Sequence, residues 1–141
     1  MVGIEQYFRN LFLSHQPLVD YLNKDKPVDE LPVLTDIYID HLPSFTDGFD
    51  EHLPLILIRN KECSDSFFYD DEPHAYDVLI SIGIGAKNYE SLSDISDLVK
   101  GLMLGEDFFI TESDSFSDSV ENMLGLLITF HNSIFMGLHN N

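Results

Sequence analysis

Three of the six histidines in this chain directly or closely follow carboxylates, and imidazole together with carboxylate oxygens is a donor set that can hold a divalent metal. The combinations are Asp40-His41, Glu51-His52 and the acidic run Asp70-Asp71-Glu72 that precedes His74. The spacing does not support a site, because the sequence has no His-x-x-x-His pair and no calcium-loop pattern. Among 25 acidic residues such adjacency arises by chance. We expect solvated loop charge here and no metal.

A glycine-rich segment, Gly83-Ile84-Gly85-Ala86-Lys87, follows an apolar stretch in the way that a phosphate-binding turn would. It lacks the third glycine of a dinucleotide fingerprint and the Gly-Lys-Ser/Thr of a P-loop. We therefore expect no nucleotide and no other cofactor. The two glycines are instead expected to serve a turn or a close contact between subunits.

Parts of a hydrolase triad occur at Ser14-His15, Ser64-Asp65 and His131, but no serine sits in a Gly-x-Ser-x-Gly elbow. The single cysteine, Cys63, is expected to be an inert side chain at the end of a strand. We predict no catalytic residues and no enzymatic activity. A small hydrolase or metal-dependent enzyme with an unrecognised site is kept as a third and weakest alternative, after the two functions given at the end of this subsection.

The charge of the chain is strongly one-sided, with 25 acidic against 7 basic residues and a formal net charge of -18 in 141 residues. Such a field repels nucleic-acid phosphates and excludes a DNA-gripping surface. A hydrophobic content of 44% nevertheless predicts one folded domain over residues 1–141. One cysteine allows no internal disulfide, and the absence of a basic leader and of a long apolar run predicts a cytosolic, non-membrane protein.

Apolar periodicity indicates where the elements lie. The stretch Tyr76 to Leu104 has strict alternation up to Ile84 and then helical spacing from Tyr89, so we expect a strand that leads into a helix, with Gly105 as a left-handed cap. Two helical pieces should open the chain over 4–22. Further strands are predicted at 37–39, 55–59, from 108, and over 123–135, while 64–73 is predicted to be a long hairpin connection.

These elements predict an α/β (α+β) fold. We expect a single domain with a four- or five-stranded mixed or antiparallel sheet. The N-terminal helices and the helix over 89–104 should pack on one face of it.

The hairpin connection combines aromatic and acidic side chains, which makes it the candidate interface. Its residues are Phe67, Phe68, Tyr69, Asp70, Asp71 and Glu72. Exposed aromatics suit docking of a partner, but aromatics also serve cores, so the alternative is a satellite cluster folded over the sheet edge.

The order of parts resembles the tail terminator proteins of long-tailed bacteriophages, also called tail completion or head-to-tail joining proteins. The resemblance rests on an N-terminal helix, on Asp36–Pro43 with its Ile-Tyr and Leu-Pro pairs, on Leu53-Pro54 opening the next strand, and on the strand-to-helix unit Tyr76–Leu102. Together these cover most of the chain from Leu18 onward.

The resemblance implies a structural virion protein at the head-tail junction, assembled in the host cytoplasm. Six copies would form a ring that caps the tail tube, stops polymerisation of the major tail tube protein and meets the head connector protein. At -18 a copy, an acidic lumen would let genome DNA pass without specific binding. The alternative from another class is an acidic adaptor or DNA-mimic inhibitor that binds a basic partner surface.

Overall fold

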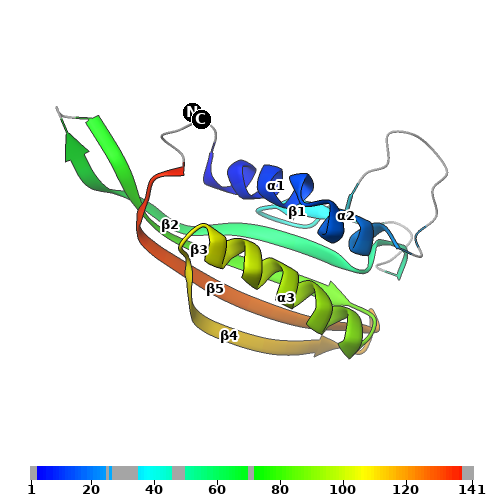
Figure 1. The fold of residues 1–141 in the computed structure, drawn as a ribbon. Coiled ribbons are helices and arrows are strands. Elements are labelled where there is room, and N and C mark those ends of the chain that lie inside the picture. Colours follow the sequence, from blue (N-terminus) through cyan, green and yellow to red (C-terminus); the bar gives the residue numbers. More distant parts are fainter. Residues whose placement is uncertain (1–2, 25, 27–34, 46–49, 70–71, 138–141) are drawn as a thin grey trace.

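The computed structural model describes residues 3–24, 26, 35–45, 50–69 and 72–137. They form one five-stranded sheet with three α-helices and a short 3-10 helix (Figure 1). The elements are α1 (Ile4–Ser14), α2 (Gln16–Asn23), β1 (Ile37–Ile39), η1 (Asp50–His52), β2 (Leu55–Tyr69), β3 (Glu72–Ala86), α3 (Tyr89–Gly105), β4 (Phe109–Asp118) and β5 (Met123–Phe135).

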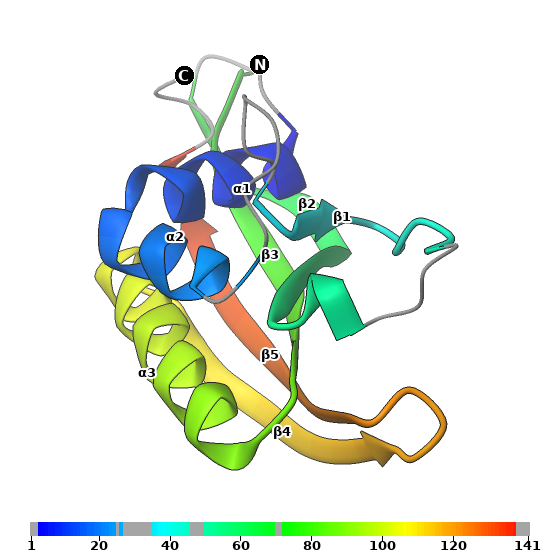
Figure 2. The ribbon, with the colours of Figure 1, turned by 90° about the vertical axis from the view of Figure 1, so that its right-hand side faces the viewer.

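The strand order across the sheet is β1-β2-β3-β5-β4. Strand β1 runs parallel to β2, and every other neighbouring pair is antiparallel, so the sheet is mixed. All three α-helices lie on one side of the sheet (Figure 2). The predicted α+β fold, strand number and one-sided helix layer are confirmed.

Strand β3 is the centre of the core. Its alternating residues Val78, Ile80, Ile82 and Ile84 are buried beneath the helices, as the two-residue period predicts. The residues between them point to the other side of the sheet, which we call the open face because no described α-helix packs on it. The helix layer therefore covers one face, and the sheet is left to present the other.

The two glycines lie inside β3, so the expectation of a turn was wrong, while a close contact between subunits stays a prediction. Gly83 and Gly85 sit on the open face, where a Cβ on Gly83 would touch Leu127 and Leu57 at 3.7 and 3.8 Å. At Gly85 an added Cβ would meet the Met123 sulfur at 2.8 Å. These glycines make room for side chains of the neighbouring strands.

Helix α3 begins with an Asn88 cap, whose side-chain oxygen accepts a hydrogen bond from the Ser91 amide at 2.8 Å. Its buried stripe confirms the helical spacing predicted from Leu92, but Tyr89 is 74% exposed because it lies in the first turn, outside that stripe. Gly105 is within the helix, and the left-handed residue after it is Asp107, with φ of 64°. The predicted glycine cap was therefore wrong by two residues.

The N-terminal helices close the core at one end of the sheet. Phe8 and Phe12 of α1 are fully buried, and the Phe8 ring packs edge-on against Phe108 with centroids 5.2 Å apart. Phe135 at the end of β5 stacks on the Phe8 ring, with centroids 5.6 Å apart. This aromatic cluster joins the first helix to the last strand.

Strands β2 and β3 run on well beyond the rest of the sheet as a hairpin (Figure 1). The sequence pattern predicted a strand at 55–59 and a connection over 64–73, whereas β2 is 15 residues long and reaches Tyr69. The ladder contains register shifts near Asn60 and Asp65. Since Arg59 to Ser64 are exposed, backbone pairing rather than burial maintains this part of the strand.

Candidate functional site

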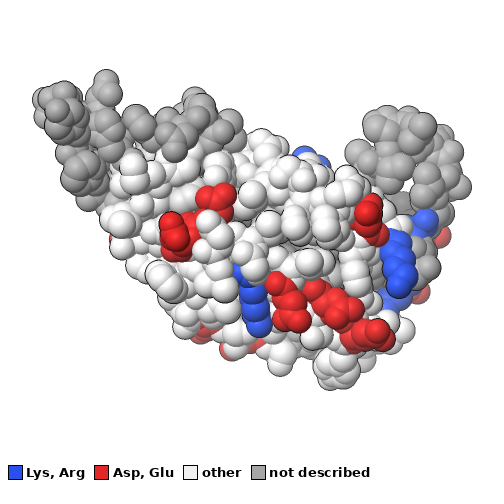
Figure 3. All heavy atoms as spheres, in the orientation of Figure 1, with Lys and Arg blue, Asp and Glu red and all other residues white. Residues whose placement is uncertain are grey.

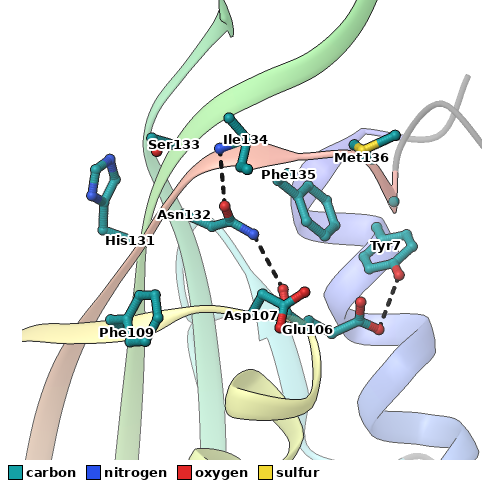
Figure 4. Close-up of a pocket in the computed structure, with 11 residues that line it drawn as sticks. Tyr7, Glu106, Asp107, Phe109, His131, Asn132, Ser133, Ile134, Phe135 and Met136 are labelled. Carbon is teal, nitrogen blue, oxygen red and sulfur yellow. Dashed lines mark hydrogen bonds between the residues drawn. The ribbon is translucent and has the colours of Figure 1, made fainter. Parts of the chain in front are cut away.

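A groove of about 720 Å³ lies where the end of β5 passes the turn between α3 and β4 (Figure 4). We call it the β5-end groove. It is lined by Tyr7, Glu106, Asp107, Phe109, His131, Asn132, Ser133, Ile134, Phe135, Met136 and Gly137. It combines Tyr7 of α1 with the turn between α3 and β4 and with the end of β5. These three parts are far apart in the sequence.

Asn132 holds the two walls of the groove together. Its side-chain Nδ2 donates to the Glu106 carbonyl at 3.2 Å, and its Oδ1 accepts from the Ile134 amide at 2.9 Å (Figure 4). Asn132 is 8% exposed, so these bonds satisfy a buried amide. They also fix the path of β5 beyond His131, the last residue of this strand that pairs with β4.

Tyr7 closes the groove from the helix side. Its hydroxyl donates to Glu106 Oε1 at 3.0 Å. Burial, and then the bond to this carboxylate, raise the pKa of Tyr7 to about 12, since both disfavour the tyrosinate. The tyrosine is therefore a positioned hydrogen-bond donor at neutral pH.

The rim of the groove is apolar. Phe109, Ile134 and Met136 are 68%, 65% and 56% exposed. Exposed large apolar side chains that gather beside a groove are typical of surfaces that bind proteins. Glu106 and Asp107 add carboxylates to the wall, so a partner that places apolar and basic side chains here would be matched.

The residues considered as parts of a triad do not form one. His131 Nε2 lies 2.6 Å from Asp77 Oδ1 across β5 and β3, and Ser64 is the cross-strand partner of Asp77. The carboxylate thus stands between the serine and the histidine, whereas nucleophile activation needs the histidine in the middle. Ser14 donates to the Leu11 carbonyl of its own helix at 2.7 Å.

A buried polar cluster surrounds Asp36 at the start of β1. Lys26 Nζ lies 2.8 Å from Asp36 Oδ2 and also donates to the Pro54 carbonyl at 2.6 Å. The Tyr38 hydroxyl donates to Asp36 Oδ1, and His52 Nδ1 is 3.2 Å from the same oxygen. Burial lowers the pKa of Lys26 and raises that of Tyr38. The cluster ties three chain segments together, which indicates a structural role.

Among the residues that the structure describes, no group of three or more His, Cys, Asp or Glu side chains could hold a metal ion. His41 lies 3.5 Å from Asp40 on the surface, and both side chains are mostly exposed. His52 Nδ1 lies 3.2 Å from Asp36 Oδ1. In the described part of the chain, no helix is long and apolar enough to cross a membrane.

The predicted interface residues lie at the far end of the projecting hairpin. Phe67, Phe68 and Tyr69 end β2, and Glu72 begins β3 as the cross-strand partner of Tyr69. Asp70 and Asp71 lie outside the described residues. The position at the tip of a protrusion suits either contact with a partner or the alternative cluster, and the choice between them remains a prediction.

Sequence reasoning missed the β5-end groove. Its residues come from three separate stretches of the chain, and no motif joins them. The usable signal was the pair Ile134 and Met136, two large apolar side chains at the end of β5 that flank a buried Phe135.

Acidic side chains gather over α3 on the helix-bearing side of the molecule (Figure 3). Glu90, Asp94 and Asp97 of this helix are exposed. The outer surface of the helix layer is therefore negative, and contacts between copies through it would be repulsive.

No protein-family model matches the chain, and no curated protein matches it either. The fold has a solved counterpart in a chain of the structure described as "Virion of native gene transfer agent (GTA) particle". The two chains superpose with a TM-score of 0.63, and the match covers 94% of this chain and 95% of that one. At 8% sequence identity, the likeness is one of fold.

Proposed function

We propose that this chain is a structural protein of a phage-like virion, and specifically a tail terminator or head-tail joining subunit. In this role, copies form a ring of six on the end of the tail tube, stop its polymerisation and connect it to the head. The chain acts by contact and not by catalysis. Its partners are other copies of itself, the major tail tube protein and the head connector protein.

The observation that carries the proposal is the fold match to a chain of the gene transfer agent virion. The match extends over nearly the whole of both chains, so it concerns the complete arrangement of sheet and helices and not a common substructure. It agrees with the order of parts on which the resemblance to tail terminators rests. The fold match supports a place in a phage-like particle, and the terminator role within that particle depends on the resemblance.

The surface of the molecule supports a role in assembly. A projecting hairpin, a ten-residue outer strand β4 that is almost entirely exposed, and a groove with an apolar rim are features of a subunit that makes several contacts. The described residues bring together no catalytic constellation and no metal cluster.

The net charge of -18 suits a conduit for DNA. Carboxylates that line a ring lumen would repel phosphates and let the genome move without adhering to the wall. Replacing lumen-facing acids by lysine is expected to slow genome ejection while rings remain intact. Unchanged ejection kinetics in such variants would count against an acidic lumen.

The direct test is tube capping. Tail tubes polymerised from the major tail tube protein of the same virus are mixed with the purified chain, and their lengths are measured by negative-stain microscopy. We expect a ring at one tube end and arrest of elongation. Tubes that elongate at the same rate with bare ends would overturn the proposal, and tight binding to a basic host protein instead would favour the acidic adaptor.

A further inference from the structure

Strand β4 forms one side edge of the sheet, with β5 on its inner side. Its ten residues are all exposed except Asp118, which is half-buried. Three acidic residues of β4 lie on the open face, because their cross-strand partners on β5 do. The pairs are Glu112 with Thr129, Asp114 with Leu127 and Asp118 with Met123. This outer strand is therefore an acidic edge whose backbone is available for pairing.

At the opposite edge of the sheet, the edge strand β1 covers only part of β2. Strand β1 pairs with β2 only as far as Ile58, so among the described residues β2 has a ladder partner on β3 alone from Arg59 to Tyr69. Arg59 and Lys61 are the only basic residues in the five described strands, counting lysine and arginine. Both are exposed.

Arg59 on the β2 edge and the carboxylates of β4 point to the same side of the sheet. Arg59 is the partner of Ser81, Ser81 is the partner of Thr129, and Thr129 is the partner of Glu112. Cross-strand partners project to one face, so Arg59 and Glu112 both lie on the open face. A sheet continued from one copy to the next would bring the cation and the carboxylates together.

We propose that copies of this chain join head to tail, with β4 of one copy pairing with the stretch of β2 from Arg59 onward in the next. The inference rests on the proposed ring and names the contact that builds it. The stretch from Arg59 to Tyr69 has eleven residues, so that with one residue bulged it matches the ten residues of β4 in length. The stretch carries Arg59 and Lys61 beside Glu62 and Asp65, so its formal charge is zero and it repels the acidic strand β4 less than an average surface of a chain of charge -18 would.

The pairing is antiparallel, because strand directions alternate from β2 through β3 and β5 to β4, and a rotated copy keeps the direction of β2. End-to-end overlap places Arg59 opposite Asp118. The register shift between Asn60 and Glu62 indicates that Lys61 is bulged, and Cys63 then lies opposite Ser115. Cys63 and Ser115 both belong to the helix-bearing face, because their partners within one copy are Val78 and Leu126. Such a contact joins different surfaces, so it closes into a ring when the rotation per copy permits.

Disulfide formation tests the pairing. Ser113→Cys, Ser115→Cys and Ser117→Cys are made one at a time in the chain that keeps Cys63, and assemblies on tail tubes are oxidised mildly. Within one copy the two edges are three strand spacings apart, roughly 14 Å, which is beyond the reach of a disulfide. Any link must therefore join two copies.

We expect a ladder of linked species on non-reducing gels, strongest for Ser115→Cys and lost when Cys63→Ser is added. Ser93→Cys, at an exposed serine of α3, is the matched control. Linking of all three β4 variants at no more than the level of this control would overturn the inference.

Charge reversal provides a second test. Arg59→Glu with Lys61→Glu should weaken ring formation about tenfold or more, and Asp114→Lys in the same chain, at the carboxylate of β4 nearest to Asp118 on the open face, should restore part of it. Asp118 is left unchanged because its carboxylate accepts from the Val120 and Glu121 amides in the β4–β5 turn. Thermal melting shows whether each variant is folded.

The outcomes separate this inference from the proposed function. Tube capping by the unaltered chain, with rings that neither link nor respond to charge reversal, retains the function and overturns the edge contact. Increased self-association on neutralising Arg59 and Lys61 would show that they keep edges apart, and would also overturn it. Failure of the unaltered chain to bind tube ends would overturn the proposed function itself.

Discussion

The ring of Phe116 on β4 covers the backbone of Gly125 on β5. The two residues are cross-strand partners on the open face, and a Cβ on Gly125 would lie 2.1 Å from the Phe116 ring. Gly125 is buried although it faces away from the helices. An edge-strand aromatic here shields a glycine backbone that would otherwise meet water.

Gly125→Ala is expected to push the Phe116 ring into solvent and to lower the free energy of unfolding by about 1 kcal/mol, as overpacking does where the neighbour can move. The measurement is urea unfolding followed by circular dichroism. In a Phe116→Ala background the same glycine substitution should be nearly neutral. Equal effects in the two backgrounds would show that the ring and the glycine are not coupled.

The buried pair Lys26–Asp36 should be sensitive to loss of one partner. Their side chains are 10% and 9% exposed, so Asp36→Ala leaves a buried ammonium without its counter-charge, and we expect a loss of about 3–5 kcal/mol. His41→Ala removes one partner of the exposed pair with Asp40 and should cost less than about 1 kcal/mol. Similar unfolding midpoints for the two variants would contradict a structural role for the cluster.

Tyr7 should make stability depend on alkaline pH. Its pKa in the folded protein is about 12 against an ordinary 10.0, so between these values the folded chain keeps a proton that the unfolded chain releases. Stability is therefore complete below about pH 10 and falls as the pH rises towards 12. Tyr7→Phe should flatten this fall in denaturant titrations, whereas Tyr89→Phe, at a ring that is 74% exposed, should leave it unchanged.

Two adjacent phenylalanines offer a matched test of the core and the groove rim. Phe108 is fully buried against Phe8 and Phe135, so Phe108→Ala is expected to cost about 3–5 kcal/mol. Phe109 is 68% exposed, so Phe109→Ala should change the midpoint little. If the groove serves assembly, Phe109→Ala should reduce tube capping without lowering the melting temperature.

Periodicity predicted the parts of the fold in which burial alternates. Strand β3, strand β5 and helix α3 each have one face in the core, and their apolar spacing is visible in the sequence. The length of the hairpin strands was underestimated because Arg59 to Ser64 have no buried face. A strand held by backbone pairing alone shows no apolar periodicity in its sequence.

The site could be predicted only in part. The tip residues around Phe67 stood out by composition, whereas the β5-end groove depends on tertiary contacts such as Tyr7 with Glu106, which are 99 positions apart. Gly83 and Gly85 misled because a glycine that accommodates a neighbour's side chain looks like a turn glycine in the sequence.

The unpaired outer strand has a consequence for the purified material. Backbone groups that accept a neighbouring copy would equally accept any extended polypeptide, and electrostatic repulsion is what keeps β4 edges of separate molecules apart. This protection disappears as carboxylates take up protons near the isoelectric point of about 4.2. We expect a solubility minimum there, with strand-rich precipitates that bind amyloid dyes, and improved recovery when extra acids are placed on β4.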